Sequence, residues 1–163
     1  MTKPLVLVVD DEVEYANKIA TAVKSNDKYE AVIAYSAREA LGELKKRRSL
    51  FGLRPNRVRC ILLDLKMPEM DGLQFLKKVR REYGNGISVI LVTAFEDTEK
   101  WEAALDGFIA GYLKKPFERQ ELLDQLDELF SGKVNAQSKM ISDTLIKGVE
   151  RLEELKRPDR PGT

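Results

Sequence analysis

Short apolar runs alternate along the chain with segments in which apolar residues recur every three or four positions. Each run is short enough for a strand, and the runs cover residues 5–9, 29–35, 60–63, 87–92 and 111–113. Nearly continuous apolar character over this length is typical of strands that are buried on both faces of a sheet. We therefore predict five buried strands.

The segments between these runs have the spacing of amphipathic helices. In the first segment, the positions that share one side are Val13, Ala16, Ile19, Ala20 and Val23. The second predicted helix begins at Ser36, because Ser36 and Glu39 match a capping box. Three further helices are predicted around residues 73–79, 96–105 and 119–130.

Alternation of strands with helices predicts an α/β fold with a parallel sheet covered on both faces. Right-handed crossover connections place the carboxyl ends of all parallel strands at one edge of the sheet. Polar residues stand at or just after these predicted strand ends, and they are Asp10, Asp11, Asp64, Thr93 and Lys115. We therefore expect these side chains to converge on one crevice, where α/β folds bind ligands.

Composition excludes several classes of site. The 163 residues include one cysteine and no histidine, and the net charge is +1. An internal disulfide, a multi-cysteine zinc site, a Ser-His-Asp triad and histidine metal ligands are therefore excluded. No apolar run reaches the length of a membrane span, and the amino terminus leads into a strand without a signal peptide. We expect a cytoplasmic protein without direct nucleic-acid or membrane binding.

The predicted crevice has the residue types of phosphoryl chemistry. Three carboxylates cannot stay close and ionised without compensation, which a magnesium ion supplies through its preference for oxygen ligands. A carboxylate can also accept a phosphoryl group to form an aspartyl phosphate. Lys115 and Thr93 have the ammonium and hydroxyl groups that would neutralise the transferred oxygens. Lys66 and Lys114 are expected to face solvent.

Four motifs in this order resemble the receiver domain of two-component response regulators. They are VVDD at 8–11, LLDLKMPEMDG at 62–72, VTA at 92–94 and YLKKPF at 112–117. The resemblance covers roughly residues 4–130. It implies a flavodoxin-like (βα)5 doubly wound sheet with strand order 2-1-3-4-5, which would form a domain of residues 1–130.

The resemblance also implies a metal-dependent phosphoacceptor. Asp64 would accept the phosphoryl group. Mg2+ would be bound by Asp11, Asp64 and the backbone carbonyl of Lys66, with Asp10 acting mainly through a metal-bound water.

Further roles on the last two strands follow from the same resemblance. Thr93, Ala94 and Lys115 would bind the phosphoryl group. Tyr112 would be the switch aromatic that turns inward as Thr93 moves, and the peptide bond before Pro116 would be cis. Phe95 has no group that could orient a hydrolytic water, so we expect it to slow the loss of phosphate.

The implied function is a signalling switch. A partner histidine kinase or phosphotransfer protein would donate phosphate, and catalysis would be limited to the chain's own phosphorylation and dephosphorylation, so it would not be an enzyme on other substrates. One alternative is a pseudo-receiver, which is an interaction module that works without phosphorylation. Another is a hydrolase like the haloacid dehalogenases, but those enzymes carry their nucleophile on the first strand.

Residues 131–163 form a predicted C-terminal extension. An apolar stripe predicts an amphipathic helix over about 135–156, although Gly148 weakens it. The stripe consists of Ile141, Leu145, Val149, Leu152 and Leu155. Its spacing favours a linker or pairing with a second copy, so we expect a homodimer. Alternatively the helix folds onto its own domain, against groups such as Phe95, Trp101, Phe108 and Ile109.

Residues 45–59 carry basic side chains without an acidic one. A patch for an acidic partner or nucleic acid is one hypothesis. A solvated helix end followed by a long loop is the favoured interpretation.

Overall fold

Five parallel strands form one sheet in the computed structural model. The structure describes residues 2–48, 56–94, 98–133 and 135–157. Strand order across the sheet is β2-β1-β3-β4-β5, which confirms the predicted flavodoxin-like order. The strands are β1 (Leu5–Val9), β2 (Glu30–Ala34), β3 (Val58–Leu63), β4 (Ser88–Thr93) and β5 (Gly111–Lys114).

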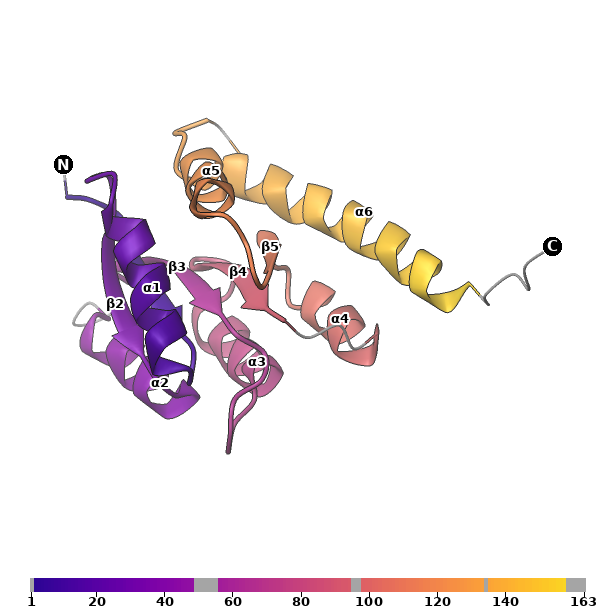
Figure 1. Ribbon diagram of the computed structural model, residues 1–163, viewed down its shortest axis with the longest axis horizontal. Coiled ribbons are helices and arrows are strands. Elements are labelled where there is room, and N and C mark those ends of the chain that lie inside the picture. The colour runs from indigo at the N-terminus through magenta and orange to yellow at the C-terminus, as the bar shows by residue number, and fades with distance from the viewer. Residues whose placement is uncertain (1, 49–55, 95–97, 134, 158–163) are drawn as a thin grey trace.

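Helices cover both faces of the sheet and one end of it (Figure 1). They are α1 (Val13–Lys24), α2 (Ala37–Lys46), α3 (Gly72–Tyr83), α4 (Thr98–Leu105), α5 (Arg119–Leu129) and α6 (Ala136–Lys156). Helices α1 and α5 pack on one face, and α2, α3 and α4 pack on the other. Because side chains alternate along a strand, Val6 and Val8 of β1 pack on the face covered by α1 and α5. Leu7 and Val9 pack on the face covered by α2, α3 and α4.

The C-terminal helix α6 packs on its own domain against α4, β5 and α5 (Figure 1). Met140 and Leu152 are buried in this contact. In the predicted stripe Ile141 and Leu145 are partly buried, whereas Val149 is 48% exposed. Of the two arrangements considered above, the chain therefore adopts the intramolecular one. The homodimer stays a prediction.

Of the groups expected to meet α6, Trp101 is in contact with it, whereas Phe108 and Ile109 have other environments. Trp101 contacts α6 through a hydrogen bond from Nε1 to the carbonyl of Gly148. Ile109 lies in the core with 1% exposure, and Phe108 remains 47% exposed. Phe95 lies outside the described residues.

Within the basic segment, residues 49–55 also lie outside the described part of the chain. Where the segment is described, Arg47 forms an ion pair with Glu43 and Arg57 forms one with Glu30. Among the described helices, none is both long and apolar enough to cross a membrane.

Candidate functional site

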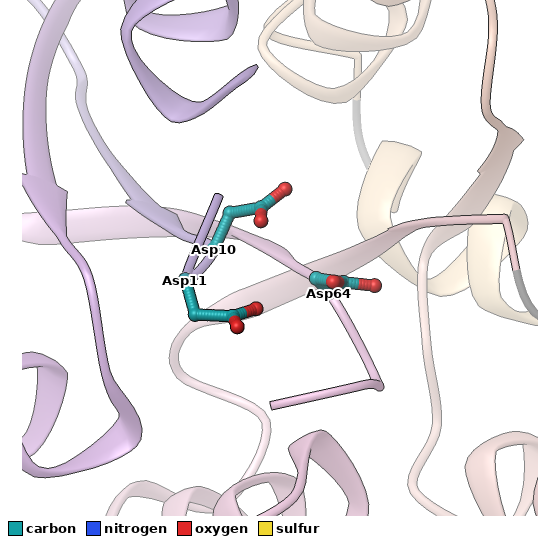
Figure 2. Close-up of side chains that lie close together, drawn as sticks. All are labelled: Asp10, Asp11 and Asp64. Atoms are coloured by element: carbon teal, nitrogen blue, oxygen red, sulfur yellow. The ribbon is translucent and has the colours of Figure 1, made fainter. Parts of the chain in front are cut away.

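Three carboxylates meet at the carboxyl ends of β1 and β3 (Figure 2). Asp10 and Asp11 follow β1, and Asp64 follows β3. One oxygen from each side chain lies within 4.8 Å of the other two. Asp10 and Asp64 are buried, whereas Asp11 is partly exposed. All three acids therefore lie at one edge of the sheet, where the sequence pattern predicted them.

Backbone hydrogen bonds extend the strand pairing past the last residue of each strand and so position these acids. The amide of Asp10 donates to the carbonyl of Ala34 at 3.2 Å, and the amide of Asp64 donates to that of Val9 at 3.0 Å. On the other side of β4, the amide of Lys115 donates to the carbonyl of Thr93 at 3.1 Å. The acids and Lys115 are thus held by the sheet itself rather than by a flexible loop.

Lys115 is the cation of the site and is almost fully buried. Its Nζ lies 2.6 Å from Asp10 Oδ2 and 3.7 Å from Asp64 Oδ2. Two further contacts were not predicted from the sequence. Nζ lies 3.5 Å from Glu12 Oε1 and 4.2 Å from the centre of the Tyr15 ring. Both residues follow the acidic pair closely, at the start of α1, and that proximity was the available signal.

The pKa values of both Asp64 and Lys115 are raised above their usual values. Burial raises the pKa of Asp64 above its usual value, while Lys115 and a hydrogen bond from Thr93 oppose that shift. Burial lowers the pKa of Lys115, but its hydrogen bond with Asp10 and the neighbouring negative charges outweigh this and raise it. Lys115 is therefore a permanent positive charge at neutral pH.

A cavity of about 400 Å3 opens over Asp64. The other residues that line it are Asp11, Glu12, Lys66, Thr93, Ala94 and Lys115. Thr93 has no exposed surface, and its hydroxyl donates a hydrogen bond to the Asp64 carboxylate, as does the backbone amide of Lys66. The residues assigned above to phosphoryl binding therefore surround one carboxylate.

Three residues discussed in the sequence analysis, Tyr112, Lys114 and Pro116, do not line this cavity. Tyr112 on β5 packs against Trp101, with ring centres 4.4 Å apart and an interplanar angle of 81°. The Lys115–Pro116 peptide bond is cis. Lys66 and Lys114 are exposed. The predicted role of Phe95 falls outside the described residues.

The donor chemistry of the acidic cluster suits a hard divalent cation. Asp10, Asp11 and Asp64 offer only oxygen ligands, and the single cysteine, Cys60, is buried within β3. Mg2+ is held by one or two carboxylates together with water and phosphate oxygens, so this cluster has enough protein ligands for it. The open cavity next to Asp64 leaves room for the remaining ligands.

Comparison with known proteins decides the family. The sequence profile described as "Response regulator receiver domain" matches residues 6–127. The chain belongs to the response regulator receiver domain family. It is therefore a receiver domain of two-component signalling, as its motifs indicated, and it carries an additional C-terminal helix beyond the matched residues.

Individual relatives resemble the receiver domain over most of its length. Response regulator MprA of Mycolicibacterium vanbaalenii is 28% identical over 162 residues, which are 96% of this chain and 64% of MprA. Transcriptional regulatory protein ZraR of Salmonella typhimurium is 31% identical over 123 residues, which are 76% of this chain and 25% of ZraR. This chain thus spans less than two thirds of the length of these relatives.

Solved structures have the same fold. A response regulator receiver protein from Pseudomonas putida is 27% identical, with a TM-score of 0.69 over 78% of this chain and 98% of that one. Chemotaxis protein CheY4 of Vibrio cholerae is 28% identical, with a TM-score of 0.64 over 77% of this chain and 98% of that one.

Proposed function

We propose that this receiver domain accepts a phosphoryl group on Asp64 from a phosphohistidine of a partner kinase or phosphotransfer protein. The observation that carries the proposal is the position of Asp64, which lies between two other carboxylates, Thr93 and Lys115 and opens onto the cavity. These 163 residues include no histidine, so the donor imidazole lies outside them.

In the proposed transfer, an oxygen of the Asp64 carboxylate attacks phosphorus in line with the phosphorus–nitrogen bond of the donor. That bond breaks as the phosphorus–oxygen bond forms, and the released imidazole nitrogen takes up a proton. Thr93 would redirect its hydroxyl hydrogen bond from the carboxylate to a phosphoryl oxygen. Lys115, 3.7 Å from Asp64, would neutralise another oxygen.

The acidic cluster would bind Mg2+ through Asp11 and Asp64, with Asp10 as a further acidic partner. When bound, Mg2+ neutralises charge on the transferred phosphoryl oxygens. The carboxylates of Asp11 and Asp64 would orient the ion, and Asp10 and Asp64 are themselves buried. We propose no catalysis on other substrates, and in this proposal the groups around Asp64 would serve its own phosphorylation and dephosphorylation.

Mass spectrometry of the intact protein after incubation with acetyl phosphate and Mg2+ tests the proposal. The wild-type chain should gain one phosphoryl group, Asp64→Asn should gain none, and Asp11→Ala should gain little because metal binding is weakened. Asp106→Asn is the matched control, since Asp106 is exposed and lies outside the cavity lining. Phosphorylation of Asp64→Asn to the wild-type level would refute the assignment.

The same experiment separates this function from a pseudo-receiver. A phosphorylation-independent interaction module would remain unmodified with acetyl phosphate and Mg2+, and the Asp64→Asn substitution would leave its partner binding unchanged.

A further inference from the structure

Helix α6 covers a surface formed by α4 and β5 of its own domain. Its Thr144 hydroxyl donates to the carbonyl of Ala110 at 3.1 Å, just before β5. Trp101 of α4 donates from Nε1 to the Gly148 carbonyl at 3.2 Å, and Lys156 forms an ion pair with Glu102. The contact therefore runs along most of the helix.

Gly148 lies where α6 packs directly against α4. A Cβ atom at this position would lie 2.6 Å from both terminal carbons of the Leu105 side chain, which is closer than carbon atoms pack. The sequence suggested that Gly148 weakens the helix. The tertiary structure shows what the glycine allows instead, which is the direct approach of the α6 backbone to Leu105 and Trp101.

The interface between α6 and the rest of the domain is less closely packed than a domain core. A cavity of about 390 Å3 lies between α6, β5 and α5, with Trp101, Tyr112 and Met140 among its lining residues. In the same cavity Oε1 of Gln125 is buried and has no hydrogen-bond partner among the described residues. Domain cores are close-packed and leave few polar groups unpaired, so this interface is of a kind that can separate.

A series of neighbouring residues runs from Asp64 to this interface. Thr93 hydrogen-bonds Asp64. In the sheet register Thr93 pairs with Lys114 and Leu91 with Tyr112, so Thr93 and Tyr112 point to the same face from neighbouring strands. Tyr112 in turn packs edge-on against Trp101, which holds Gly148.

We propose that α6 is a releasable occupant of the α4–β5 surface, docked while Asp64 is unmodified and released when Asp64 carries a phosphoryl group. The inference rests on the proposed function. A phosphoryl group takes the Thr93 hydroxyl away from the carboxylate, and the rearrangement passes through Tyr112 to Trp101. The cavity beside both rings gives them room to move, and the Trp101–Gly148 hydrogen bond is lost with that movement.

Release has a definite consequence for binding. It exposes two surfaces that the unmodified chain keeps against each other, the α4–β5 surface and the inner face of α6 with Met140 and Leu152. The occupant is residues 136–156 of the chain itself, so any partner of the α4–β5 surface must compete with it.

Linkage requires the reverse effect. If modification of Asp64 weakens docking of α6, then weakening the docking must favour modification of Asp64 by the same factor. Substitution Gly148→Val weakens docking through its clash with Leu105. Lys156→Glu weakens it more gently by repelling Glu102, and it serves as a second variant if Gly148→Val unfolds the helix. Ile146→Val is the matched control, because Ile146 is 57% exposed on the same helix.

The experiment uses the whole 163-residue chain with beryllofluoride and Mg2+, which mimic the aspartyl phosphate. Trp101 is the only tryptophan, so its fluorescence reports docking of α6 directly. Fluorine NMR independently reports occupancy of Asp64. Hydrogen exchange should accelerate in α6 but not in α1 when beryllofluoride binds to the wild type.

We expect wild-type Trp101 emission to shift on saturation toward the emission of unliganded Gly148→Val. The half-saturating beryllofluoride concentration should fall about fivefold or more in Gly148→Val, less in Lys156→Glu, and not at all in Ile146→Val. Unchanged emission and exchange at full Asp64 occupancy, or equal half-saturation in all variants, would overturn the inference alone. Absence of any bound fluorine signal at Asp64 would overturn the proposed function together with it.

Discussion

Nζ of Lys115 lies 2.6 Å from Oδ2 of Asp10, closer than its 3.7 Å distance to Asp64. Family resemblance implies that this lysine binds the phosphoryl group on Asp64, yet here Asp10 is its nearest partner. The buried ammonium and the proposed Mg2+ would therefore share the same carboxylates. Their mutual repulsion would limit how tightly the site binds Mg2+ before phosphorylation.

Replacing Lys115 by methionine should strengthen Mg2+ binding while abolishing phosphorylation. Removal of the positive charge leaves three acids without compensation, so we expect the Mg2+ dissociation constant to fall on the order of tenfold. Calorimetric titration with Mg2+ measures this. Lys114→Met is the control, because Lys114 is the exposed neighbour. Weaker Mg2+ binding in Lys115→Met than in the control would contradict the prediction.

Gly72 lies where the chain after Asp64 returns to start α3. A Cβ atom at Gly72 would lie 2.4 Å from the backbone oxygen of Asp64 and 2.6 Å from Cα of Leu65, and neither backbone atom can move freely. Gly72→Ala should therefore lower the free energy of unfolding by about 3 kcal/mol and reduce phosphorylation by displacing Asp64.

Gly42→Ala gives a control for the Gly72 prediction with the opposite sign. Gly42 lies inside α2, and an added Cβ would have no atom within 4 Å. Alanine is the better helix former, so this variant should gain about 0.5–1 kcal/mol. Urea unfolding measures both variants. A Gly72→Ala variant as stable as the wild type would show that the backbone at Asp64 adapts.

Arg80 holds the loop before β4 to the turn before β5. Its guanidinium donates to four backbone carbonyls, those of Gly84, Ile87, Gly107 and Phe108. Arg80→Met should lower the free energy of unfolding by about 3 kcal/mol, because several carbonyls lose their donor at once. Arg81→Met should change it by less than about 0.5 kcal/mol, since Arg81 is exposed. Urea unfolding of the two variants tests the difference, and equal stabilities would contradict it.

Tyr29, the residue just before β2, is linked to α5 because its hydroxyl donates to the Asp127 carboxylate. Burial and this hydrogen bond raise the pKa of Tyr29 well above its ordinary value. A raised folded-state pKa means that the stabilisation is complete below the ordinary pKa of about 10 and is lost as the pH rises through the higher folded value.

Wild type should accordingly exceed Tyr29→Phe in unfolding free energy by about 1 kcal/mol near neutral pH. This difference should shrink as the pH rises beyond about 10, the ordinary tyrosine pKa. Chemical unfolding of both proteins at a series of pH values measures it. A difference that stays constant or grows at alkaline pH would contradict the prediction.

Local sequence pattern was sufficient for the strands, the helices and the edge where the site lies. Apolar runs of four to seven residues, such as 60–63 and 29–35, favour one structure where they alternate with amphipathic helices. That structure is a strand buried in a parallel sheet. Chirality of the crossovers then brings Asp10, Asp64 and Lys115 to one edge without reference to any particular contact. Strand order came from the family motifs rather than from periodicity.

Contacts between distant segments were decided only by the tertiary structure. Periodicity showed that residues 135–156 have an apolar stripe, but not that Gly148 would meet Leu105 on the same domain. It could not show that Lys115 would lie closer to Asp10 than to Asp64, or that Arg80 would donate to carbonyls of two loops. Spacing along the chain shows which side of a helix or strand is apolar. The partner of each side chain depends instead on how elements far apart in sequence are brought together. It depends also on which of several nearby charges or carbonyls lies closest.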